Sequence, residues 1–183
     1  REGGKMSRYL RAECLKRRHS VERKLIFLVP AVLLFISLAL VYAGVGLGSF
    51  SNALVCNWCV PVSALAVLLF CQTSGRREQK LQFRTIRGLP LDMKGVFAAK
   101  TAMTALHLLA ATALLWLLSL AAEGAYMGRV PGISQAAAFG LGYGLLWLSL
   151  LWQIPLCLLL IWKIGFALSL VLVLIASAVG GLF

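Results

Sequence analysis

The sequence has little negative charge. It contains 6 Asp and Glu residues against 18 Lys and Arg, and none of the acidic residues falls inside a long apolar run, although Glu123 lies at the margin of one. A carrier driven by a proton or sodium gradient usually binds its coupling ion with carboxylates inside the membrane or with broken helices. The scarcity of acidic residues therefore argues against an ion-coupled carrier.

Groups that carry enzymatic chemistry are also scarce. The two histidines, His19 and His107, and the scattered serines form no nucleophile–base pair and no metal-ligand set. The glycine-rich stretches at 44–50 and 139–144 are not followed by Gly-Lys-Ser/Thr, so neither has the pattern of a phosphate-binding loop. We therefore expect that the chain is not an enzyme and has no catalytic residues, no metal site, no cofactor and no ATP site of its own.

The five cysteines form no cluster of metal ligands. Cys56 and Cys59 make a Cys-x-x-Cys pair in CNWC, a spacing that indicates thiol redox chemistry when it lies in a soluble βαβ unit. Here the pair opens an apolar run, so we favour two small apolar side chains over a redox pair. The sequence alone leaves the redox alternative open.

Apolar residues, in contrast, are abundant, and they make up 61% of the 183 residues. Soluble domains average about 45–50%, and here the excess falls into unbroken blocks long enough to cross a bilayer. The blocks predict an all-α integral membrane protein, a polytopic helix bundle with spans at about 25–47, 53–72, 96–122, 135–162 and 164–183. Because the last block ends without a polar flank, we expect a sixth span beyond it.

The positive charges predict how the helices are oriented. Nine Lys and Arg lie in residues 1–24 and seven in residues 76–100, whereas the 123–134 loop has Arg129 alone. Short cytoplasmic loops collect Lys and Arg, so both basic segments should face the cytoplasm. We expect a cytoplasmic N-terminus in a cytoplasmic membrane, and basic residues that meet anionic lipids rather than nucleic acid.

A polar, basic insert at 73–95 separates the second predicted span from the third. Within it, Phe83, Ile86 and Leu89 repeat every three residues and make one apolar ridge on a short helix. Asp92 can cap the helix that follows. Such a helix either lies on the membrane surface or docks into a cytoplasmic partner, and the residues themselves favour neither alternative.

Three ionisable residues lie in or beside the third span. His107 is a possible functional group inside the membrane, with a neutral histidine bonded to a neighbouring helix as the alternative. We expect Lys100 and Glu123, at the two margins, to extend toward the headgroups. In the fourth span, Gly140 and Gly144 have the spacing that favours close helix packing.

Several of these stretches together resemble the lantibiotic-immunity ABC-2 type permeases, the MutE/EpiE-like family. They are the basic lead-in to a first span with an early Pro30, the Asn-Trp pair with Pro61, the run QKLQFRTIRGLPLDMKGVFAAK at 79–100 and WQIP at 152–155. The resemblance covers about residues 13–166. The chain departs from the family where CNWC opens the second span in place of an aromatic-rich stretch.

The resemblance implies a six-helix permease subunit with an interfacial helix at 6–20 in the basic segment 1–24. It also implies a related second permease or a homodimer, separate ABC ATP-binding subunits that hold ATP and Mg²⁺, and a lantibiotic peptide as cargo expelled for self-immunity. It makes the insert a coupling helix, with partner-docking residues Phe83, Arg84, Ile86, Arg87 and Leu89. Two alternatives remain, an ABC-2 permease for another amphipathic cargo (an antibiotic or a lipid-linked compound) and a non-transporting anchor or sensor subunit.

Overall fold

The computed structural model describes residues 14, 21–43, 62–80, 93–127 and 132–180. The long elements in these ranges are all α-helices, which confirms the all-α prediction. They are α2 (Val21–Tyr42), α4 (Ser63–Lys80), α6 (Met93–Met127), α7 (Ile133–Leu150), α8 (Gln153–Ile164) and α9 (Phe166–Gly180).

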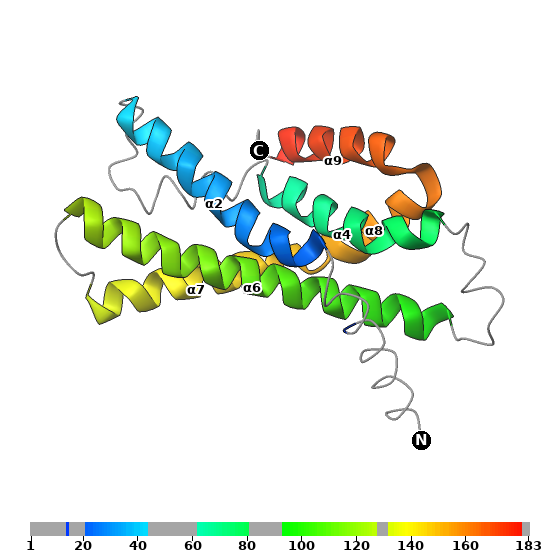
Figure 1. The fold of residues 1–183 in the computed structure, drawn as a ribbon, viewed down its shortest axis with the longest axis horizontal. Coiled ribbons are helices and arrows are strands. Elements are labelled where there is room, and N and C mark those ends of the chain that lie inside the picture. The colour runs from blue at the N-terminus through cyan, green and yellow to red at the C-terminus, as the bar shows by residue number, and fades with distance from the viewer. Residues whose placement is uncertain (1–13, 15–20, 44–61, 81–92, 128–131, 181–183) are drawn as a thin grey trace, which may run out of the picture.

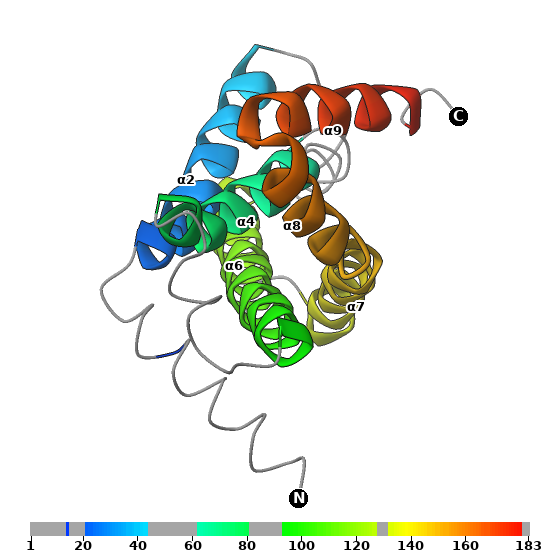
Figure 2. The same ribbon diagram turned by 90° about the vertical axis from the view of Figure 1, so that its right-hand side faces the viewer.

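The helices form an elongated bundle whose long elements alternate in direction (Figure 1). α2 and α6 run one way, α4 and the consecutive α7 and α8 run the other way, and α9 turns back along α8. The longest helix, α6, contacts α2, α4, α7 and α8, whereas α7 lies at the edge of the bundle (Figure 2). A chain that crosses a bilayer several times follows such an alternating path.

Three stretches are long and apolar enough to cross a membrane, namely Arg23–Leu40, Lys94–Ala125 and Ile133–Ile164. Two shorter apolar helical stretches, Ser63–Gly75 and Phe166–Ala176, overlap the predicted second and fifth spans. Apolar helices satisfy all backbone hydrogen bonds internally, which is the requirement for a segment in lipid. The described part of the chain is therefore built as a helical membrane protein.

The bundle has a packed interior and an apolar exterior. Leu33 of α2, Leu108 of α6 and Leu158 of α8 are fully buried and belong to one hydrophobic cluster. Outward-facing side chains are also large and apolar, for example Phe35 at 74% exposed and Leu141 at 71%. An exposed apolar surface over several helices marks a region that is covered by lipid or another chain.

The fourth predicted span is divided into two helices. Pro155, in the third position of α8, has no N–H to donate to the carbonyl of Leu151. At Leu151 and Trp152 the backbone keeps helical φ and ψ values, but the Leu151 N–H bonds to the Leu148 oxygen at 3.2 Å, three residues back. The WQIP stretch therefore interrupts the α-helical hydrogen bonding, a feature that apolar composition alone did not reveal.

α8 and α9 are joined by a single residue, Gly165, with φ at 90° and ψ at 172°. Non-glycine residues avoid this backbone region, so the reversal depends on glycine. It comes two residues after Lys163, where the sequence predicted that the apolar block is interrupted.

α4 extends beyond the predicted end of the second span at Gln72 and stays helical to Lys80. The Thr73 hydroxyl bonds back to the Leu69 and Phe70 carbonyls at 3.1 and 3.0 Å, which lets a polar residue continue the helix. The first part of the insert at 73–95 is therefore a continuation of α4, and residues 93–95 begin α6.

Candidate functional site

The predicted partner-docking residues Phe83, Arg84, Ile86, Arg87 and Leu89 lie outside the described residues, as does Asp92. The helices on both sides of them are described, however. α4 ends at Lys80 and α6 begins at Met93, so the structure shows what the insert is attached to. That attachment is the candidate functional site.

Lys100 joins α6 to α4 near this attachment. Its side chain is 1% exposed, and its Nζ donates to the backbone oxygen of Ser74, 3.4 Å away on α4. A buried ammonium group needs such oxygen partners because its desolvation is costly. The bond connects the end of the apolar part of α4 to the second turn of α6.

Trp162 of α8 packs against the same place. Its ring meets the ring of Phe97 on α6 edge to face, with centroids 5.6 Å apart, and its Nε1 lies 3.3 Å from where a Cβ on Gly75 of α4 would stand. A side chain at this position would have to displace the indole by a few tenths of an ångström. We call Ser74, Gly75, Phe97, Lys100 and Trp162 the three-helix junction.

The prediction that Lys100 and Glu123 extend to the headgroups was wrong, because both side chains are buried, at 1% and 4% exposed. Glu123 lies two residues before the end of the apolar stretch Lys94–Ala125 of α6, so its place at the margin is as the sequence predicted, and only its burial was not. Hydropathy gives the composition along a helix but not which face its neighbours cover. The burial of Glu123 nevertheless places one carboxyl group in the interior of the bundle at this margin.

Glu123 and Lys100 belong to a buried polar stripe on α6, and sequence reasoning missed it. Its other members are Thr104, Thr112 and Ser119. The signal was present in the spacing, because steps of four, eight, seven and four residues keep all five on one side of a helix. Thr112 and Ser119 bond to carbonyls of their own helix at 2.9 and 2.7 Å.

Among the described residues, the Thr104 hydroxyl has no hydrogen-bond partner. It lies one turn from Lys100 on the same side of α6, so the stripe presents an unused polar atom beside the junction. Buried polar atoms of this kind are rare in folded proteins, and this one extends the polar character of the junction toward the middle of α6.

His107 is half-buried on α6. Its Nδ1 lies 2.7 Å from the backbone oxygen of Met103, and because a carbonyl can only accept, Nδ1 is the donor. This partner of Nδ1 lies in the same helix. A functional role for His107 stays a prediction.

Two tryptophans join α7 to α6. Trp116 Nε1 donates to the Ala136 oxygen at 3.2 Å, and Trp147 Nε1 donates to the Ala105 oxygen at 3.1 Å. Gly140 lies against Trp116, where a Cβ would meet the indole at 3.4 Å. Gly140 therefore packs closely against α6 as predicted, whereas no atom of the described chain lies within 4 Å of the Cβ position of Gly144, so close packing at Gly144 stays a prediction.

Cys56 and Cys59 lie outside the described residues, so the choice between apolar and redox roles stays a prediction. Cys71 and Cys157 are free and buried, and Cys14 is free and exposed. The Cys71 thiol lies 3.7 Å from the Ile154 oxygen and joins α4 to α8. In the described part of the chain, no group of three potential metal ligands occurs.

The chain was compared with protein-family models, with curated proteins and with solved structures, and none of them matches it.

Proposed function

We propose that this chain is a permease subunit of an ATP-driven ABC-2 type exporter that expels lantibiotic peptides for self-immunity. One observation carries the proposal: the stretch at 79–100 that resembles the permease family connects α4 and α6 at the three-helix junction. ATP and Mg²⁺ bind to separate ATP-binding subunits, and the chain itself supplies the membrane path.

The lengths of the flanking helices support docking by the insert over simple attachment to the lipid surface. The apolar part of α4 ends at Gly75, yet the helix runs to Lys80. α6 begins at Met93, two turns before Lys100. At about 1.5 Å per residue, both helices extend roughly 7–10 Å beyond the junction, which is about the depth of one headgroup layer.

The junction supports a route for transmitting motion. A partner that pushes on the insert moves the ends of α4 and α6 together, because Lys100 bonds them. Trp162 then transfers that displacement to α8 by direct packing on Phe97 and at Gly75. Packed interfaces of this kind shift between discrete arrangements instead of deforming gradually. In this proposal the insert is the coupling helix, and Phe83, Arg84, Ile86, Arg87 and Leu89 contact the ATPase.

The remaining features follow from the family resemblance. The N-terminus is cytoplasmic in a bacterial membrane, the visible helices are five spans of six, and the complex includes a second related permease or another copy of this chain. The positive charge of residues 1–24 and 76–100 supports this orientation.

The test is co-purification in mild detergent. The tagged chain, expressed with its neighbouring genes, is compared with Phe83→Ala/Ile86→Ala/Arg87→Ala. A matched control, Leu10→Ala/Leu15→Ala/Arg17→Ala, removes the same kinds of side chain from the N-terminal basic segment. The proposal expects an ATP-binding protein to accompany the wild type and the control, and to be lost with the insert variant.

Two outcomes contradict the proposal. If no ATPase accompanies any of the three proteins, the chain is not an ABC permease. If the insert variant retains the ATPase and its turnover, the insert is not the coupling helix. In that case the chain is better explained as a non-transporting anchor or sensor subunit. If the complex is intact but exports a different amphipathic compound, the chain is better explained as an ABC-2 permease for another cargo.

A second candidate function, an ion-coupled carrier, is favoured by one observation, the buried Glu123 in α6. It requires uptake or export by this chain alone in vesicles with a proton or sodium gradient and no ATP. Glu123→Gln should abolish that transport. ATP-dependent export that is unaffected by Glu123→Gln excludes this candidate.

A further inference from the structure

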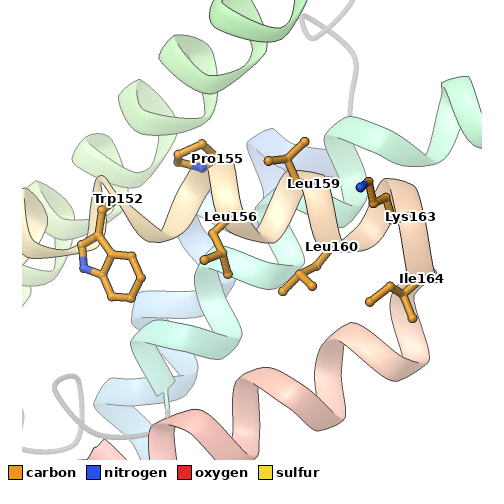
Figure 3. Close-up of a pocket in the computed structure, with 7 residues that line it drawn as sticks. All are labelled: Trp152, Pro155, Leu156, Leu159, Leu160, Lys163 and Ile164. Carbon is orange, nitrogen blue, oxygen red and sulfur yellow. The ribbon is translucent and has the colours of Figure 1, made fainter.

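One face of α8 is turned away from the bundle and forms a groove. Figure 3 shows its two edges, with Pro155, Leu159 and Lys163 on one side. On the other side are Trp152, Leu156, Leu160 and Ile164. Each edge is a row of residues four apart, and such rows leave a furrow between them. The volume of the groove is about 430 Å³.

The groove is apolar along its length and charged at one end. Trp152 is 64% exposed at the end near the middle of the span. Lys163 is exposed at the other end, in the last turn of α8. In the described part of the chain, the ammonium group of Lys163 makes no ion pair or hydrogen bond. An exposed ammonium group at the end of an apolar furrow is complementary to an anion that carries a hydrocarbon chain.

The dimensions of the groove fit one leaflet of a bilayer. Trp152 and Lys163 are eleven residues apart, or about 16 Å along a helix. Half of the hydrocarbon core of a bilayer is about 15 Å thick. The C-terminal end of α8, whose last turn holds Lys163, lies at the same end of the bundle as the start of α6 (Figure 1). An acyl chain from that leaflet therefore reaches from a headgroup at Lys163 to the indole of Trp152.

The composition of the groove disfavours a second helix as its occupant. Helices associate in membranes through small residues that allow close approach, and no Gly, Ala, Ser or Thr lines this groove. The exposed face of α7, in contrast, offers Gly142 and Gly144 with open space around them. A flexible hydrocarbon chain fills a furrow between leucines without needing such close contact.

We propose that the α8 groove is a binding site for an anionic phospholipid, with the acyl chain between the two rows and the phosphate on Lys163. The site is separate from the insert and does not depend on the ATP-driven export proposed above. It is distinct from general lipid solvation because it selects the headgroup charge.

The test uses the indole of Trp152 as the reporter. The full chain is reconstituted in phosphatidylcholine vesicles that contain a minor fraction of phosphatidylglycerol, with bromine on the acyl chains of either one lipid or the other. The quenching due to Trp152 is the difference between the wild type and Trp152→Phe, so the other tryptophans stay in place. A lysine near an anionic surface contributes about 1 kcal/mol, so brominated phosphatidylglycerol should quench roughly fivefold more per molecule.

The controls separate the groove from the charge of the surface as a whole. Lys163→Gln should reduce the ratio of quenching by brominated phosphatidylglycerol to quenching by brominated phosphatidylcholine to about one. Lys163→Arg should retain the ratio of the wild type. Lys94→Gln removes an exposed lysine at the same end of the bundle that does not line the groove, and it should retain the preference. Circular dichroism of each variant checks that the helices are intact.

Three results overturn the proposal. Equal quenching by the two lipids in the wild type means that the groove does not select the headgroup. A preference that survives Lys163→Gln means that the phosphate is held elsewhere. No quenching of Trp152 by either lipid means that protein covers the groove, and a second helix then becomes its occupant.

Discussion

Gly165 provides a sharp test of the backbone geometry between α8 and α9. Its φ of 90° lies where an alanine is strained, and no atom lies within 4 Å of its Cβ position, so the effect of Gly165→Ala comes from the backbone alone. A non-glycine residue in this region costs about 1–3 kcal/mol. The Gly165 carbonyl also accepts bonds from the Ser169 hydroxyl at 2.6 Å and N–H at 3.3 Å, so relief of the strain disturbs the start of α9.

Gly142→Ala is the matched control. Gly142 also has open space around its Cβ position, but it lies inside α7, where alanine is favoured over glycine by up to about 1 kcal/mol. Gly165→Ala should therefore lower the stability, whereas Gly142→Ala should leave it unchanged or raise it slightly. The same side chain is added in both cases.

The assay is thermal unfolding in detergent, followed by circular dichroism. For a chain of this size, 1 kcal/mol corresponds to about 2–4 °C in Tm, so Gly165→Ala should lower Tm by roughly 3–10 °C. If the two variants have equal Tm values, or if Gly165→Ala is the more stable, then the assigned backbone conformation at Gly165 is wrong.

Three further variants test the packing of α6. Trp116→Phe removes an indole hydrogen bond to α7 and should destabilise the protein by about 1 kcal/mol. Its Tm should be lower than that of Trp152→Phe, whose indole is exposed, and equal Tm values would mean that the bond is absent. Gly75→Leu forces a side chain onto Trp162 and should cost about 1–3 kcal/mol, with a change in tryptophan emission; an unchanged spectrum and Tm would place the helices further apart. His107→Phe removes the bond to the Met103 carbonyl and should lower the stability by about 1 kcal/mol; an unchanged Tm would show that this bond does not stabilise the protein.

The apolar blocks predicted the helical class and the approximate positions of the long helices, because a membrane helix is specified mostly by its own composition. The first predicted span, 25–47, overlaps α2, and the third, 96–122, lies within α6. α6 extends beyond the predicted span at both ends, and α2 begins four residues before its predicted span. Polar residues such as Thr73 continue a helix by bonding to its own carbonyls, which a hydropathy profile does not register.

The burial of Lys100 and Glu123 was not predictable in the same way. It depends on which residues of other helices cover them, and for Lys100 the partner is Ser74, 26 positions away. Trp162, Phe97 and Gly75 likewise meet only when three helices pack together. Their spacing along the chain gives no indication of it, so the junction could not be predicted, although the polar stripe on α6 was present in the sequence periodicity.

The break at Trp152 affects how the protein fits bilayers of different thickness. A straight helix over the 32 residues Ile133–Ile164 would be about 48 Å long, whereas the hydrocarbon layer is about 30 Å thick. α6, at 35 residues, is longer still and unbroken, so it meets a mismatch by tilting or by projecting into water. α7 and α8 meet it by bending at Trp152. A thinner membrane therefore changes the angle between α8 and α6, so membrane thickness affects how Trp162 packs on Phe97.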